Sequence, residues 1–336
     1  METLRLSDDA NGIKKAAEII KNGGVVAIPT ETVYGLAASA YDENAVNKIF
    51  IAKGRPQDNP LIVHTCNTHM TREIVEDFSA DAQKLANEFW PGPLTIILKR
   101  NGKIPSSVSA GLDTVAVRMP SNEVARKLIE VSGLPLAAPS ANLSGSPSPT
   151  SADHVLKDLD GKIDAVIMSE DCTVGVESTV VSLAVTPYRI LRPGFVTQEE
   201  IAEILPETVV DKAVLQELKS DEKAASPGMK YKHYSPKAEV FLVEGDKKAF
   251  CDFINNKENS FAICFDEDLK DLKIKSISYG SEQDTKKQAR MIFSLLRKVD
   301  EIGAKTVYVH APKKEGIGLA VYNRLIRAAA FKVISL

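Results

Sequence analysis

The sequence predicts two α/β domains: a larger one with a mixed β-sheet, followed by a smaller one with a Rossmann-like parallel sheet. Up to residue 206, strand-like and helical segments alternate. A polar stretch with prolines and glycine then breaks the pattern, and beyond it short apolar strands alternate again with long helical patterns. The chain has 336 residues, 44% of them hydrophobic, so each domain can bury its own core.

The two domains are separated by a segment without helix or strand patterning. Pro227 and Pro236 discourage both structures there. We therefore expect a first domain at 1–206, an interdomain linker at 207–237 and a second domain at 238–336.

The helices of the first domain are predicted from apolar spacing and capping residues. Asp42 can cap a helix whose apolar residues recur at i, i+3 and i+4, and Gly54 ends it. Thr197 and Glu200 form a capping box before another helix. The helix that follows this capping box is predicted at Gln198–Leu205. Four further helices are predicted, at Ala10–Lys21, Ala80–Phe89, Glu123–Glu130 and Ala152–Leu159.

The strands are predicted from short apolar runs bounded by turn residues. In the first domain they are Val25–Ile28, Leu61–Thr65, Leu94–Lys99, Val115–Met119, Ala165–Met168 and Val180–Leu183. This β-rich middle favours a mixed rather than a purely parallel sheet. In the second domain EVFLVEG, FAICFD and KTVYVHA are strand-like, and Lys286–Ile302 is helical.

The composition is that of an ordinary soluble globular protein. A net charge of −3 provides no global basic field of the kind found in dedicated nucleic-acid binders. The four cysteines form no CxxC pair and lie near no histidine at zinc-ligand spacing, so neither a disulfide framework nor a zinc site is indicated. No apolar run approaches the roughly 20 residues of a membrane span, and no signal-like N-terminus is present, so we expect a cytoplasmic protein.

The segment KGRPQDNPL, Lys53 to Leu61, places two cations and a rigid turn between a helix and a strand. Lys53 falls in the last helical turn, and Pro56 and Pro60 stiffen the loop from which Arg55 projects. A stiffly held guanidinium suits a bidentate phosphate contact. An isolated basic loop is more often a solvated turn, so other segments must decide between the two interpretations.

Four other segments share one pattern, an apolar run that ends in hydroxyl, amide or cationic side chains next to proline or glycine. They are PTETVYGL, TVAVR with Arg118, PLAAPSANLSG with Ser140 and Asn142, and STVVSL followed by YRILRPG with Ser178 and Arg192. Strand ends and loops of this kind commonly line one pocket. With the basic loop, they predict a pocket for an anion.

In this order, PTETVYGL, KGRPQDNPL, PSANLSG and LRPG resemble the YrdC-like family, and specifically its long, two-domain L-threonylcarbamoyladenylate synthases. The segment GIGLAVYNRLIRAA resembles the second domain of that family, so the resemblance covers essentially the whole chain. It implies a twisted mixed sheet around an open cavity in the first domain. Ser182 in STVVSL departs from the acid often found there, and no role is assigned to that position.

The resemblance implies a nucleotidyltransferase that forms L-threonylcarbamoyladenylate and pyrophosphate from L-threonine, bicarbonate and ATP, the first step of tRNA threonylcarbamoyladenosine modification. A carbamate oxygen would attack the α-phosphorus, so the protein supplies positioning and charge stabilisation rather than a nucleophile. Mg²⁺ would accompany ATP, and no resident metal site is expected. A downstream transferase would pass the group to tRNA, and direct tRNA binding is left open.

The resemblance also implies roles for individual residues. It assigns catalytic roles to Lys53 and Arg55, which would hold phosphates. The expected ATP-binding residues are Lys53, Arg55, Asn59, Thr114, Ser140, Asn142, Ser148, Arg192 and Tyr234. The expected L-threonine-binding residues are Thr32, His64, Arg118, Ala138 and Ser178.

Several of these residues have simpler interpretations. His64 could be a core histidine, Thr32 a turn residue, and Ser140 a cap of the next segment. Tyr234 lies in KYKHYSPK, where aromatic rings alternate with cations. From its composition this segment would be a solvated hinge, whereas the resemblance makes it a candidate active-site lid in which few packing contacts hold Tyr234.

Other functions stay open at this point. A non-catalytic RNA-binding module is one, although the mildly acidic charge counts against it because phosphate contacts dominate such affinity. A carbamoyltransferase of the hydrogenase-maturation type also contains a YrdC-like domain, but those chains carry CxxC zinc motifs that this sequence lacks. Gly316 and Gly318 precede a helix, yet without a third glycine they predict a packing turn rather than a dinucleotide site.

Overall fold

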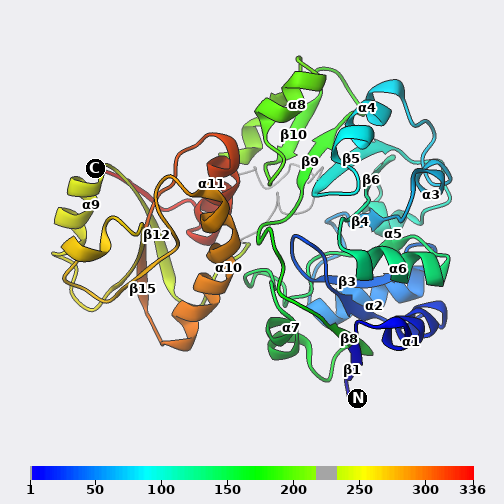
Figure 1. Cartoon of the computed structure of the whole chain (residues 1–336), viewed down its shortest axis with the longest axis horizontal. Coiled ribbons are helices and arrows are strands. Elements are labelled where there is room, and N and C mark those ends of the chain that lie inside the picture. The colour runs from blue at the N-terminus through cyan, green and yellow to red at the C-terminus, as the bar shows by residue number, and fades with distance from the viewer. Residues whose placement is uncertain (1, 217–232) are drawn as a thin grey trace.

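Two α/β domains lie side by side in the computed structural model, which describes residues 2–216 and 233–336 (Figure 1). The strands of the first domain are β1 (Leu4–Ser7), β2 (Val26–Ile28), β3 (Gly35–Ser39), β4 (Ile62–His64), β5 (Leu94–Lys99), β6 (Thr114–Arg118), β7 (Leu136–Ala137), β8 (Ala165–Met168), β9 (Thr179–Ser182), β10 (Arg189–Arg192) and β11 (Val209–Val210). Its helices are α1 (Ala10–Lys21), α2 (Glu43–Lys53), α3 (Thr68–Arg72), α4 (Ala80–Phe89), α5 (Ser106–Ser109), α6 (Glu123–Ser132), α7 (Ala152–Leu159), α8 (Gln198–Ile204) and the 3₁₀ helix η1 (Lys212–Val214).

The second domain is smaller. Its elements are β12 (Glu239–Glu244), α9 (Lys247–Ile254), β13 (Phe261–Cys264), η2 (Leu269–Asp271), β14 (Ser276–Ser278), α10 (Thr285–Glu301), β15 (Thr306–His310), α11 (Gly316–Ala328) and β16 (Val333–Ser335). The predicted GIG turn opens α11. A Cβ on Gly318 would lie 2.4 Å from the backbone oxygen of Lys313, so this glycine permits close packing of the turn.

The predicted fold class is confirmed by the pairing of the strands. The first sheet has the order β1-β8-β2-β3-β7-β4-β6-β5-β9-β10-β11, and it is mixed because β4 lies parallel to β6 and antiparallel to β7. The second sheet has the order β14-β13-β15-β12-β16, and its described pairs are all parallel. Parallel pairing fits the helices that connect its strands.

Capping residues explain where the helices of the first domain begin and end. α1, α4 and α7 have the predicted bounds. α2 starts after the Asp42 cap and stops at Gly54, which has a left-handed φ of 60°. The predicted capping box before α8 is present. α6 continues past its predicted end to Ser132, because the left-handed residue that stops it is Gly133.

Part of the predicted linker continues the first sheet. β11 pairs in parallel with β10, and η1 follows it directly. The side chain of Asn323 on α11 donates to the backbone oxygen of Val214 in η1 at 2.6 Å. Residues 217–232 of the predicted linker, with Tyr231, lie outside the described residues.

The two domains meet through α10 and α11, which face the first domain, whereas α9 lies on the far side of the second sheet (Figure 1). Arg297 on α10 forms a bidentate ion pair with Asp158 on α7, at 3.0 and 2.8 Å. Gly175 has a φ of 84°, and a Cβ there would lie 2.3 Å from the Cα of Arg290, so the loop backbone of the first domain rests directly on α10. The interface is therefore closely packed.

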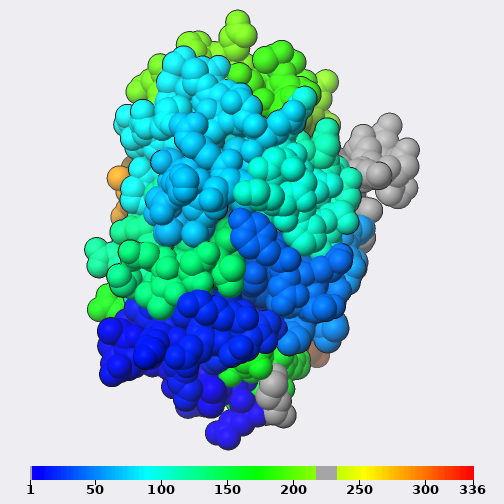
Figure 2. Space-filling view, turned by 90° about the vertical axis from the view of Figure 1, so that its right-hand side faces the viewer, coloured from blue at the N-terminus to red at the C-terminus, as the bar shows by residue number. Residues whose placement is uncertain are grey.

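Figure 2 shows the face of the first domain that points away from the second domain. The dark blue atoms of α1 and the cyan atoms of α4 lie on this face. Strand ends and loops that carry the predicted site residues lie on the side of the interface instead (Figure 1). Among the helices of residues 2–216 and 233–336, none has both the length and the apolar character needed to cross a bilayer.

Candidate active site

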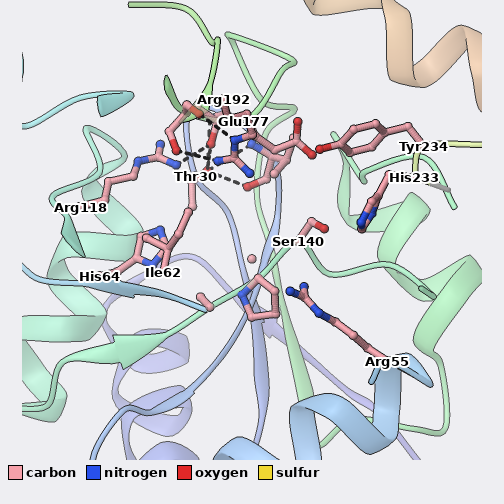
Figure 3. Close-up of a pocket in the computed structure, with 16 residues that line it drawn as sticks. Thr30, Arg55, Ile62, His64, Arg118, Ser140, Glu177, Arg192, His233 and Tyr234 are labelled. Carbon is pink, nitrogen blue, oxygen red and sulfur yellow. Dashed lines mark hydrogen bonds between the residues drawn. The ribbon is translucent and has the colours of Figure 1, made fainter. Parts of the chain in front are cut away.

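A cavity of about 60 Å³ lies where strand ends and loops of the first sheet meet His233 and Tyr234 (Figure 3). Nine of the predicted site residues line it: Thr32, Arg55, His64, Arg118, Ala138, Ser140, Ser178, Arg192 and Tyr234. The structure thus brings together residues from segments far apart in the sequence. Arg118 and His64 lie on one side of the cavity and Arg55 on the other (Figure 3).

The loop after β2 positions the first polar residues of the cavity. The Thr30 hydroxyl donates to the backbone oxygen of Val33 at 2.6 Å and accepts from the backbone N–H of Thr32 at 3.2 Å. This hydroxyl turn fixes the loop just after Pro29. The Thr30 and Thr32 hydroxyls then lie 2.8 Å apart on the cavity wall.

Arg118, at the end of β6, is buried and already partly engaged. Its Nη2 pairs with Glu31 Oε1 at 2.6 Å, Nη1 donates to Thr32 Oγ1 at 2.9 Å, and Nε donates to the backbone oxygen of Gly92 at 3.3 Å. A guanidinium carries five N–H donors, so one donor on each terminal nitrogen has no partner among residues 2–216 and 233–336. Two adjacent donors of this kind match a carboxylate.

His64, at the end of β4, is a buried and neutral histidine. Burial, with the neighbouring Arg118 acting in the same direction, lowers its pKa to about 3. Its Nδ1 has no hydrogen-bond partner among the described residues. A buried polar atom without a hydrogen-bond partner is unfavourable. A ligand that forms a hydrogen bond with Nδ1 would remove this cost, which would favour its binding.

Arg55 and Arg192 bring positive charge to the cavity without a matching carboxylate. Arg55 is half-buried, and its Nη2 donates only to the backbone oxygens of Asn59 and Pro60, at 3.1 and 3.3 Å. Arg192 is buried, and it donates to the backbone oxygen and hydroxyl of Ser178, both at 3.0 Å. Neither forms an ion pair within the described part of the chain. Burial lowers the pKa of Arg55 to about 10 and also lowers that of Arg192.

Lys53 lies behind the cavity wall rather than on it. Its Nζ donates to the backbone oxygens of Ser140 and Asn142, at 2.5 and 2.7 Å, and the side chain is buried. Burial lowers its pKa well below the usual value, and Arg55 acts in the same direction. Lys53 therefore braces the PSANLSG loop from α2, and its contact with phosphate stays a prediction.

Four other predicted ATP-binding residues do not line the cavity either. Asn59 and Asn142 are buried beside it, and Asn142 donates to the backbone oxygens of Leu143 and Ser146 within its own loop. Ser148 donates to Glu177. Thr114 begins β6, at the end of the strand opposite to Arg118. Their contacts with ATP stay predictions.

Tyr234 contacts the cavity, but the expectation that few packing contacts hold it is wrong. It is buried in an apolar cluster with residues of α10 and α11. Its ring lies 5.2 Å from that of Phe293, and Arg324 lies 5.9 Å from the ring centroid. The interface between the domains, which a linker pattern does not reveal, accounts for this burial.

The sequence analysis missed several residues at the site. Glu31 and Glu177 each directly precede a predicted site residue, Thr32 and Ser178, and a carboxylate at these positions was the available signal. Arg324 is buried in α11 together with Asn323 and Arg327, and a buried arginine indicates a partner elsewhere. Thr30 and His233 also line the cavity.

Comparisons with known proteins agree with these observations. Residues 18–194 match the Sua5, YciO and YrdC family, described as "Telomere recombination", and residues 196–330 match the "Threonylcarbamoyl-AMP synthase, C-terminal domain". The threonylcarbamoyl-AMP synthase of Pyrococcus abyssi is 45% identical over 329 residues, 96% of this chain and 95% of its own length. That of Bacillus subtilis is 40% identical over 340 residues, 99% of this chain and 97% of its own.

Solved structures show the same similarity. P. abyssi Sua5 in complex with L-threonine superposes with a TM-score of 0.91 at 41% identity, covering 100% of this chain and 99% of that one. A P. abyssi Sua5 variant in which a histidine and the tyrosine after it are replaced by alanine gives a TM-score of 0.92 at 41% identity, covering 99% and 98%. The chain therefore belongs to the family of two-domain threonylcarbamoyl-AMP synthases.

Proposed function

We propose that this chain joins L-threonine, bicarbonate and ATP to give L-threonylcarbamoyladenylate and pyrophosphate, the first step of tRNA threonylcarbamoyladenosine modification. The observation that carries the proposal is the pair of guanidiniums, Arg55 and Arg192, that line one cavity without a carboxylate partner among the described residues. Positive charge removed from water favours a bound anion. The named synthases that match the whole chain support this choice of reaction.

The amino acid would occupy the side of the cavity that carries Arg118 and His64. The two free donors of Arg118 match the carboxylate of threonine, and Glu31 holds the guanidinium in place for it. His64 is neutral at physiological pH, so its ring can donate or accept a hydrogen bond without adding a charge to the cavity. P. abyssi Sua5, which is 41% identical, was solved in complex with L-threonine, which supports this substrate.

ATP would lie between Arg55 and Arg192, and Arg192 lies near Glu177, away from Arg55 (Figure 3). The carbamate formed from the threonine amine and bicarbonate attacks the α-phosphorus, and pyrophosphate leaves. The two guanidiniums stabilise charge on the phosphate oxygens, and no protein nucleophile is needed.

Mg²⁺ enters the proposal as the counter-ion of the triphosphate. Within residues 2–216 and 233–336, no group of three or more His, Cys, Asp and Glu side chains is placed to hold a metal ion. The product is a reactive mixed anhydride, and a tRNA transferase would consume it.

Pyrophosphate release, measured with each amino acid in turn and with or without bicarbonate, tests the proposal. We expect release to require ATP, Mg²⁺, bicarbonate and L-threonine together. Serine should react more slowly, because one buried methyl group is worth about 1–3 kcal/mol in such discrimination. Equal turnover without bicarbonate would contradict the carbamate route, and salt-dependent tRNA binding without pyrophosphate release would favour an RNA-binding module.

A further inference from the structure

The ion pair between Glu177 and Arg324 joins the two domains directly behind the cavity. Arg324 on α11 is fully buried, and its Nε donates to Glu177 Oε2 at 2.9 Å. Its Nη2 donates to the backbone oxygen of Glu177 at 3.3 Å, and its Nη1 to that of Pro193. A side chain of the second domain therefore fixes a carboxylate that lines the cavity of the first.

The other oxygen of Glu177 is also engaged. The Ser148 hydroxyl donates to Oε1 at 2.6 Å. Burial alone would raise the pKa of Glu177, but Arg324 and Arg192 outweigh it and hold the pKa below its ordinary value. The carboxylate is thus charged, and each of its oxygens accepts a hydrogen bond from another side chain of the protein.

Arg192 stands close to Glu177 on the cavity wall but does not pair with it (Figure 3). Its Nε and Nη2 donate to Ser178, the residue that follows Glu177. In the described part of the chain, the ion pair of Glu177 is made with Arg324. Arg192 and Glu177 attract one another through space, and each favours the charged form of the other, but among the described residues no direct contact with Glu177 occupies the donors of Arg192.

We propose that Arg324 is a positioning residue that holds the Glu177 carboxylate away from Arg192, so that Arg192 keeps its charge for an anionic ligand in the cavity. A buried carboxylate without a partner is strongly unfavourable. If Arg324 were lost, Glu177 would turn to the neighbouring cation, Arg192. The inference rests on the proposed function in taking ATP as the anion, and it gives the second domain a role in ATP binding.

Calorimetry with two probes, ATP and inorganic pyrophosphate, tests the inference without any turnover. Arg324→Met should weaken the binding of both probes about tenfold or more, the loss of one charge-assisted contact. The double variant Glu177→Gln with Arg324→Met should restore the affinity to within about threefold of wild type, because the competing carboxylate is gone. A purely structural contact would change the unfolding temperature of these variants and leave the affinity for both probes unchanged.

Asp158→Asn is the matched control. It breaks the other buried ion pair between the domains, the one with Arg297, and neither residue lines the cavity. We expect it to lower the unfolding temperature and to leave the affinity for both probes unchanged. A double variant as weak as Arg324→Met, or a control as weak as Arg324→Met, would overturn the inference.

Two further comparisons keep the test decisive. If Arg324→Met does not fold, as judged by circular dichroism, Arg324→Lys replaces it, with and without Glu177→Gln; the same rescue is expected from a smaller loss. If the variants follow the expected order but the wild type releases no pyrophosphate in the presence of all substrates, the proposed function fails and this inference stands. A wild type that binds neither probe would overturn the inference.

Discussion

Replacing Arg55 with methionine separates the two roles that a cation in this cavity can have, binding an anion and stabilising the fold. Methionine keeps a side chain of similar length and removes the charge and its donors. We expect the affinity for ATP to fall on the order of 10- to 100-fold, because a charge-assisted hydrogen bond contributes about 1.5–3 kcal/mol. The affinity for threonine should change little, since Arg55 lies on the other side of the cavity from Arg118 and His64 (Figure 3).

The effect of Arg55→Met on stability follows from two opposing contributions. Burial lowers the pKa of Arg55 from 12.5 to about 10. Because the side chain is only half-buried, solvent screens part of this effect, and the charged form is made less favourable by about 2 kcal/mol. Against this stand hydrogen bonds to the backbone oxygens of Asn59 and Pro60, each worth about 1 kcal/mol. The two contributions nearly cancel, so the free energy of unfolding should stay within about 1 kcal/mol of wild type.

Denaturant unfolding and calorimetry of each ligand together measure both effects. Arg100→Met is the control: Arg100 also donates to two backbone oxygens, those of Leu112 and Ile104, but it does not line the cavity. It should lose about 2 kcal/mol of stability and keep the affinity for ATP. If Arg55→Met were destabilised as much as Arg100→Met and still bound ATP normally, Arg55 would be a structural residue and our reasoning about the cavity would be wrong.

Three other predictions concern the remaining side chains of the cavity. Arg118→Ala should weaken threonine binding on the order of 10- to 100-fold and leave ATP binding largely intact, and calorimetry of each ligand separately would expose a swapped or uniform pattern. Because the pKa of His64 is about 3 when folded and near 6.5 when unfolded, its neutral ring stabilises the fold above pH 6.5, and that contribution is lost as the pH falls from 6.5 toward 3. Between pH 6.5 and 4, wild type should therefore lose up to about 1.4 kcal/mol per pH unit more than His64→Gln in denaturant titrations, and equal slopes would show that the ring is not buried neutral. Tyr234→Ala should lower both the unfolding temperature, since the ring packs on Phe293, and the product yield, whereas a plain spacer would show neither change.

Local signals in the sequence were sufficient for most helices and for the fold class. α1 and α4 have the predicted bounds because the capping side chain and the apolar face of each helix can both be read from one short stretch of the sequence. β3 was not predicted, because its sequence GLAAS has little strand propensity. It becomes a strand through pairing with β2 and β7 on either side, which is tertiary context.

The candidate site was predictable where its residues lie at strand ends and unpredictable where a partner comes from the other domain. Arg118 and Arg192 could be placed in one pocket because each closes an apolar strand beside a proline or glycine. The contact between Glu177 and Arg324 spans 147 residues of sequence and has no local signature. For the same reason, the residues adjacent to Tyr234 in the sequence predicted few packing contacts, although its ring packs on Phe293 of α10.

Lys53 and Arg55 lie two residues apart in one basic segment, yet we expect replacement by methionine to affect stability at Lys53 and ATP binding at Arg55. The Lys53 side chain is buried, and its Nζ donates to the backbone oxygens of Ser140 and Asn142. Lys53→Met would leave the buried carbonyl of Asn142 and the half-buried carbonyl of Ser140 without that partner, at a cost of about 1–3 kcal/mol for the buried one and less for the other. The burial penalty of the Lys53 charge offsets part of this cost. We therefore expect a loss of about 1–3 kcal/mol in the free energy of unfolding, measured in urea, where Arg55→Met changes it by about 1 kcal/mol or less. A Lys53→Met variant as stable as wild type but unable to bind ATP would show instead that the amine leaves the carbonyls to hold phosphate.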